Sequence, residues 1–90
     1  MPRFYFHLHH DAREIPDLDG SECADAGIAR MRALETVLEM LAEDLRRGQI
    51  DLGWWLTVED KAGQEIERLG FGKVLESAVT LSQPDPMPRP

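Results

Sequence analysis

The N-terminal segment holds the residues whose types and spacing could bind a metal ion. His7, His9 and Asp11 follow one another in a His-x-His-x-Asp spacing. Neutral imidazole and carboxylate groups are good ligands for zinc and similar metals. Because side chains alternate between the two faces of a strand, His7 and His9 would point to the same side and could chelate one ion. One hypothesis is therefore a metal-binding protein or a metal-dependent enzyme that uses these three residues.

The ordinary interpretation of these residues is the favoured one. A catalytic zinc site needs a third protein ligand and a shaped cavity, yet all three histidines of the chain lie in this segment. Metallohydrolases with this spacing are also far longer than 90 residues. We therefore expect Tyr5, His7 and His9 to face solvent from a sheet, and we expect no metal ion or other cofactor.

Two further motifs lack the partners that chemistry would need. The segment Asp17-Leu18-Asp19-Gly20 has the spacing of a calcium loop, but Ile15 and Ala26 stand where the first and last ligands belong. Cys23 has acidic neighbours, which disfavour a reactive thiolate. The chain has no phosphate-binding loop and no nucleophile elbow. The sequence predicts turns and packing at these positions, and no enzymatic activity.

Length and composition predict one cytoplasmic domain. The chain has 90 residues, of which 42% are hydrophobic, and a formal net charge of -7. No apolar run approaches the roughly 18 residues that cross a bilayer, and the N-terminus lacks the apolar region of a signal peptide. A single cysteine excludes an intramolecular disulfide and fits a reducing compartment.

The acidic excess lies in two segments. Residues 11–25 carry a net charge of -5 and residues 51–69 carry -3, whereas residues 26–50 are balanced. Because nucleic acids and anionic membranes are bound mainly through Lys and Arg, neither is an expected partner. The expected partner is a protein, either a second copy of this chain or a basic protein that contacts residues 11–25.

Hydrophobic alternation and turn residues predict the elements of the fold. They are strands at residues 3–10, 14–18, 54–59 and 64–69, a helix at 26–47, and one more element at 73–81 that could be helix or strand. The sequence thus predicts an α+β fold in the order strand, strand, helix, strand, strand: a four-stranded antiparallel sheet with one amphipathic helix packed on one face. The single domain spans residues 1–81, and the Pro-rich tail 82–90 is expected to be disordered or extended.

The expected helix has clear ends and one apolar stripe. Asp25 is a suitable N-cap, and Gly48 is a suitable terminating glycine. The stripe is predicted to pack on the sheet, and it consists of Ala24, Gly27, Met31, Leu34, Leu38, Leu41 and Leu45.

Adjacent tryptophans place one aromatic ring on each face of the third strand. By parity, Trp54 is expected to enter the core and Trp55 to lie beside Tyr5 and His7 on the outer face, if the first and third strands are neighbours. Half-exposed Tyr, His and Trp side chains are common in interfaces. Tyr5, His7 and Trp55 are therefore the interface candidates.

The chain resembles a family of short uncharacterised bacterial proteins, a domain-of-unknown-function family. The opening Met-Pro-Arg-Phe-Tyr-Phe-His, the segment Asp17-Leu18-Asp19-Gly20-Ser21-Glu22, the Arg-rich helix end and Leu69-Gly70-Phe71 carry the resemblance. It implies the architecture above and no established activity, so no catalytic residue is transferred.

A second stretch, from Ile15 to Cys23, is similar to the Pro-Asp-Leu-Pro-Gly-Cys segment of small antitoxin proteins. That similarity implies a small basic toxin as partner. The preferred hypothesis is a non-catalytic binding or regulatory module that self-associates through the outer sheet face or a strand edge. The alternatives are the metal-binding protein and the antitoxin-like partner of a basic protein.

Overall fold

The protein, here a computed structural model, is described for residues 1–82, so almost all of the predicted tail lies outside the described residues. Its elements are β1 (Arg3–His10), β2 (Arg13–Ile15), β3 (Ser21–Glu22), α1 (Ala26–Arg47), β4 (Trp54–Glu59), β5 (Glu65–Gly70) and α2 (Phe71–Ser82). No helix among these residues is long and apolar enough to cross a membrane.

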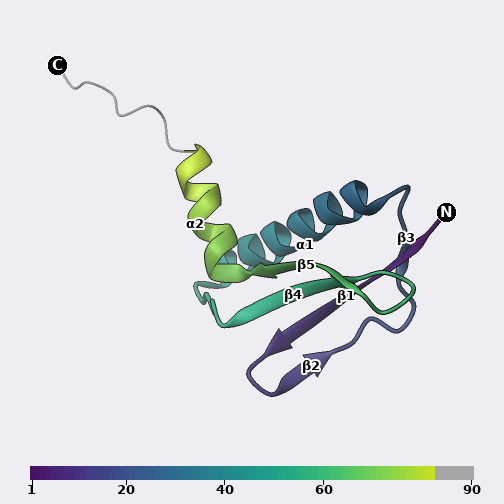
Figure 1. The fold of residues 1–90 in the computed structure, drawn as a ribbon. Coiled ribbons are helices and arrows are strands. Elements are labelled where there is room, and N and C mark those ends of the chain that lie inside the picture. Colours follow the sequence, from purple (N-terminus) through teal and green to yellow (C-terminus); the bar gives the residue numbers. More distant parts are fainter. Residues whose placement is uncertain (83–90) are drawn as a thin grey trace.

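The strands form one antiparallel sheet in the order β2-β1-β4-β5 (Figure 1). The short strand β3 pairs with the beginning of β1. Strands β1 and β4 are neighbours, as expected, with Phe6 opposite Val58 and Leu8 opposite Leu56. Both helices contact β4 and β5 and also contact each other. The inner face of the sheet is therefore the helix-covered face, and the outer face is the opposite one.

The α+β class was predicted, but the four-stranded sheet with one helix was wrong. The structure has five strands and two helices within residues 1–82. Strand β3 is only two residues long, too short for any hydrophobic alternation to reveal it. The element expected at residues 73–81, which could have been helix or strand, is helix α2, and it begins at Phe71. Phe71 and Val74 anchor α2 because both side chains are buried in the core.

The predicted ends of α1 are confirmed. The Asp25 carboxylate accepts a hydrogen bond from the backbone N–H of Ile28 at 2.9 Å. At the other end Gly48 adopts a left-handed conformation with φ of 75°, and its N–H donates to Leu45 O at 3.0 Å. Both caps use contacts between residues close in sequence, which explains why the sequence predicted them.

The predicted buried stripe of α1 was wrong. The residues of α1 that are buried are Ala29, Ala33, Val37 and Leu41, and only Leu41 belonged to the predicted stripe. Met31, Leu34, Leu38 and Leu45 are exposed instead, with 61%, 43%, 37% and 57% of their surface accessible. The sheet and α2 already supply large buried side chains, among them Leu56 and Phe71, so small residues fit beneath the helix.

The pairing of β4 and β5 contains a bulge. The register shifts between Val58 and Glu59 of β4. Ile66 and Leu69 consequently both pack against the core. The β4–β5 turn is closed by Asp60, whose side chain accepts hydrogen bonds from the N–H groups of Ala62 and Gln64, each at 2.9 Å.

Candidate functional site

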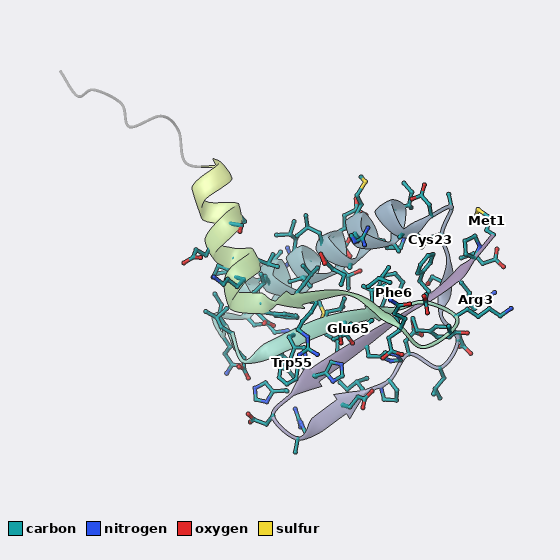
Figure 2. The ribbon with its side chains drawn as sticks, viewed as in Figure 1. Met1, Arg3, Phe6, Cys23, Trp55 and Glu65 are labelled. Atoms are coloured by element: carbon teal, nitrogen blue, oxygen red, sulfur yellow. The ribbon has the colours of Figure 1, made fainter. Side chains whose placement is uncertain are left out.

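Four aromatic side chains form a continuous row on the outer face of β1 and β4. The Tyr5 and His7 rings are stacked at 6.5 Å with an interplanar angle of 8°, and His9 and Trp55 are stacked at 5.2 Å with the same angle. His7 and His9 join the two stacks edge-on at 6.5 Å. We call Tyr5, His7, His9 and Trp55 the aromatic row. Figure 2 shows Trp55 on the side of the sheet away from α1.

Strand pairing creates the row. Tyr5, His7 and His9 alternate along β1, and His9 pairs directly with Trp55 of β4. The three interface candidates therefore share one face, as predicted. The sequence placed His9 on this face but did not include it among the interface candidates, although its ring lies between Trp55 and the other two rings. Its parity with His7 was the signal that could have identified it.

His9 is held by a neighbour on β4. Its Nε2 atom lies 2.9 Å from Oγ1 of Thr57, within hydrogen-bond distance. Thr57 is only 2% exposed, and this contact satisfies its hydroxyl. The contact fixes the imidazole in the orientation that stacks on Trp55, which makes the stack a preorganised surface.

His7 is held from both sides. Its Nδ1 atom accepts a hydrogen bond from the backbone N–H of Asp17 at 3.0 Å, which places the proton of the neutral ring on Nε2. That Nε2 atom faces Oε1 of Glu59 at 3.4 Å. The His7 side chain is only 13% exposed. It therefore acts mainly as a support for the Tyr5 ring stacked on it.

The structure does not bring the three predicted metal ligands together. Asp11 lies beyond the end of β1 and contacts His10, with its Oδ2 atom 3.3 Å from Nδ1 of that residue. One ring nitrogen of His7 and one of His9 already have protein partners. Within residues 1–82 no group of three or more His, Cys, Asp or Glu side chains is arranged to hold a metal ion.

The loop after β2 is fastened to β1 by four residues that we call the N-terminal clasp: Arg3, Asp17, Gly20 and Glu22. The Asp17 carboxylate accepts hydrogen bonds from the N–H groups of Phe6 at 3.1 Å and Gly20 at 3.0 Å. The Arg3 guanidinium donates to the Asp19 carbonyl at 2.9 Å and to Glu22 at 3.1 Å. Several acidic residues of the 11–25 segment therefore hold the fold together.

The clasp and the aromatic row lie within one matched region. A family model for a domain of unknown function matches residues 3–72. The chain belongs to the DUF6894 family. The match runs from β1 to the beginning of α2 and includes every residue of the clasp and of the row. No curated protein and no solved structure matches this DUF6894 chain.

Carboxylates border the aromatic row of this DUF6894 domain. Glu14 of β2 pairs with His9, and Glu59 of β4 pairs with Tyr5. The one cation on this side of β5, Arg68, is bound by Glu65 through two hydrogen bonds of 3.0 Å. This pairing lowers the pKa of Glu65 and raises that of Arg68. Two carboxylates, those of Glu14 and Glu59, therefore lie at the border of the row.

A second acidic contact ties the end of β1 to the loop before β4. The Asp51 carboxylate accepts a hydrogen bond from Gly53 N–H at 2.9 Å and lies 2.9 Å from Nε2 of His10. The Gly53 hydrogen bond, with a smaller contribution from His10, lowers the pKa of Asp51 below its usual 3.8.

This shift predicts a pH dependence of stability. Because the pKa of Asp51 is lower in the folded state, its ionised form stabilises the fold above pH 3.8, and this contribution disappears as the pH falls through the folded-state pKa. Urea titrations between roughly pH 5 and pH 2 should show a smaller loss of stability for Asp51→Asn than for the wild type. An equally steep loss in both proteins would contradict the assignment, and Asp19→Asn serves as the control.

Proposed function

We propose that this DUF6894 domain is a non-catalytic binding module that holds a basic protein segment on its aromatic row. The observation that carries the proposal is the arrangement of four aromatic rings in two stacked pairs, with carboxylates along the border. Both helices of the described chain contact the sheet from the opposite face. Neither helix therefore covers the row, whose four side chains are partly exposed.

Aromatic faces combined with carboxylates recognise cations. A guanidinium or ammonium group is attracted to the face of a tryptophan ring, and the interaction contributes about 0.5–2 kcal/mol. Arginine also stacks on planar rings and donates to carboxylates through its planar fork. On this sheet Trp55 supplies the strongest face, while Glu14 and Glu59 supply acceptors on either side.

The charge of the whole chain supports the same partner. The segments with net charges of -5 and -3 contain β2 and the β4–β5 turn, which flank the row. Such a field accelerates the encounter with a basic chain and repels nucleic acid. The antitoxin-like alternative would use this same complementarity, with a small basic toxin as the partner.

The state of the titratable groups favours binding over catalysis. His7 is engaged by a backbone N–H, and His9 by the Thr57 hydroxyl. The chain's only thiol, on Cys23, is 1% exposed and belongs to the core cluster. Because one ring nitrogen of each of these histidines is engaged and the thiol is buried in the core, His7, His9 and Cys23 do not form a catalytic pair.

The test is a calorimetric titration of the protein with a synthetic arginine-rich peptide at low salt. We expect saturable binding that weakens as salt is added, because the attraction is partly long-range. Trp55→Ala should weaken binding by about tenfold, the equivalent of one cation–π contact. The matched control is Leu18→Ala, since Leu18 is 85% exposed and lies outside the row.

Two results would contradict the proposal. One is the absence of saturable binding by the wild type. The other is equal binding by wild type and Trp55→Ala, which would place the peptide elsewhere on the acidic surface. A glutamate-rich peptide of the same length should not bind, and its binding would show that charge complementarity is not involved.

A further inference from the structure

A groove lies where the two helices meet strand β5 at the end of the sheet (Figure 1). It has a volume of about 290 Å³. Three different elements supply its apolar walls, with Leu34 from α1, Leu69 from β5 and Val74 from α2. Pockets that hold small ligands are lined mainly by apolar side chains and begin at about 300 Å³. The groove therefore has the size and the lining for a small ligand with an apolar body.

The walls of the groove combine buried and exposed apolar side chains. Val74 is 5% exposed and belongs to the core cluster, and Leu69 packs against that cluster. Leu34, in contrast, is 43% exposed. An apolar chain placed between these walls would remove the Leu34 side chain from water without displacing a residue of the core, which is favourable.

The charged residues that line the groove are both cations, Arg68 and Lys73. The Arg68 guanidinium is engaged, because it donates two hydrogen bonds of 3.0 Å to Glu65. Lys73 forms no ion pair within the described residues. Ser77 lies one turn further along α2 and adds a hydroxyl to the lining. An ammonium and a hydroxyl can both donate hydrogen bonds, so the complementary ligand group is an anion.

The net charge of the chain limits how many negative charges this ligand can carry. The chain as a whole has a formal net charge of -7, which repels every anion at long range. The Lys73 ammonium is one positive charge, and it can balance one negative charge on the ligand. A carboxylate therefore fits this lining better than a doubly charged phosphate.

We propose that this groove binds a small carboxylic acid with an apolar tail. The tail lies against Leu34, Leu69 and Val74, and the carboxylate pairs with Lys73. No residue of the aromatic row lines the groove. This site therefore goes beyond the peptide-binding role proposed above, and each of the two can fail without the other.

A titration of the isotope-labelled full chain with sodium octanoate, followed by nuclear magnetic resonance, tests the site. Octanoate combines an unbranched apolar tail with one carboxylate. We expect saturable shifts of the backbone amides of Leu34, Leu69 and Lys73, with a dissociation constant on the order of 0.1–1 mM. Acetate, which has the carboxylate without the tail, should produce no saturable shifts of these amides at the same concentrations.

Variants at the two ends of the ligand separate the charge from the apolar contact. Lys73→Gln should weaken octanoate binding by about fivefold, the equivalent of one exposed ion pair. The same variant should leave the affinity for octan-1-ol unchanged, because this alcohol has the tail without the charge. Circular dichroism should be unaltered, since Lys73 lies on the surface.

Leu34→Glu should weaken octanoate binding more than tenfold, because it removes an apolar wall and brings a second negative charge close to the carboxylate. The matched control is Leu45→Glu, which makes the same change at an exposed leucine of α1 about 16 Å further along the helix. Leu45→Glu and Trp55→Ala should both bind octanoate as the wild type does.

Four results would overturn the proposal. The first is the absence of saturable shifts of the groove amides at roughly 5 mM octanoate. The second is an equal loss of octanoate and octan-1-ol binding in Lys73→Gln, which would show that the ligand's charge is not recognised. The third is a loss of octanoate binding in Trp55→Ala, which would place the ligand on the aromatic row. The fourth is tighter binding of octyl phosphate than of octanoate, which would exclude a preference for carboxylates.

Discussion

Replacing Gly20 with alanine should lower the free energy of unfolding by about 3 kcal/mol, combining a left-handed backbone cost with forced contacts. Gly20 has φ of 72°. A Cβ atom at this position would lie 2.8 Å from Cε2 of Tyr5 and 2.9 Å from both Cγ of Arg3 and the carbonyl oxygen of Phe4. One of these neighbours is main chain in β1, so relief would require the loop to move away from the strand.

The control for this variant is Gly63→Ala. Gly63 also has a positive φ, 86°, but no atom would lie within 4 Å of a Cβ atom added at this position. Gly63→Ala should therefore lower the free energy of unfolding only by the cost of the left-handed backbone, about 1 kcal/mol. Urea denaturation of both variants separates the two contributions. Equal losses would show that the loop does not press against Tyr5 and Arg3. Because Tyr5 is at one end of the aromatic row, Gly20→Ala should also weaken peptide binding.

Replacing Asp17 with alanine should lower the free energy of unfolding by about 2–4 kcal/mol, since it removes the acceptor of two charge-assisted hydrogen bonds. The Asp17 carboxylate binds the N–H of Phe6 between the segments of β1 that pair with β2 and β3. It also binds the N–H of Gly20 within the loop. Both N–H groups are partly buried, and alanine would leave them without this partner.

Two further variants make the result specific. In the described chain the Asp19 side chain makes no hydrogen bond, and only its carbonyl oxygen accepts one, from Arg3. Asp19→Ala should therefore be close to neutral although it removes the same charge two residues away. The loss of stability in Asp17→Asn should lie between those of the two alanine variants, because its single amide oxygen replaces only one of the two carboxylate oxygens that accept hydrogen bonds. Equal denaturation midpoints for Asp17→Ala and Asp19→Ala would contradict the clasp.

The features that could be predicted from the sequence depend on local contacts or on strand parity. The caps of α1 involve residues at most four positions apart, and strand β4 begins and ends at the predicted residues. Parity alone placed Tyr5, His7 and Trp55 on one face. These signals do not require knowledge of which distant segments meet.

The features that were missed depend on distant segments. The covered face of α1 is set by the volume that Phe71 and the sheet already fill, and an amphipathic pattern gives large leucines more weight than small alanines. Strand β3 is defined by antiparallel pairing with a distant part of the chain, where Ser21 pairs with Phe4 and Glu22 pairs with Arg3. The hydrogen bond from Asp17 to His7 joins the loop after β2 to β1, between residues ten positions apart. The hypothesis of a metal site did not include this hydrogen bond, which occupies Nδ1 of His7.

The position of Cys23 has a kinetic consequence. Its side chain is 1% exposed, and its backbone N–H donates to the carbonyl of Pro2 at 3.0 Å. A thiol reagent in solution can reach the sulfur only after the segment from the clasp to α1 detaches from the N-terminus. The labelling rate at increasing urea concentrations would therefore report how often this segment opens, and whether it opens separately from the rest of the molecule. As the chain has no other thiol, the signal comes from one place.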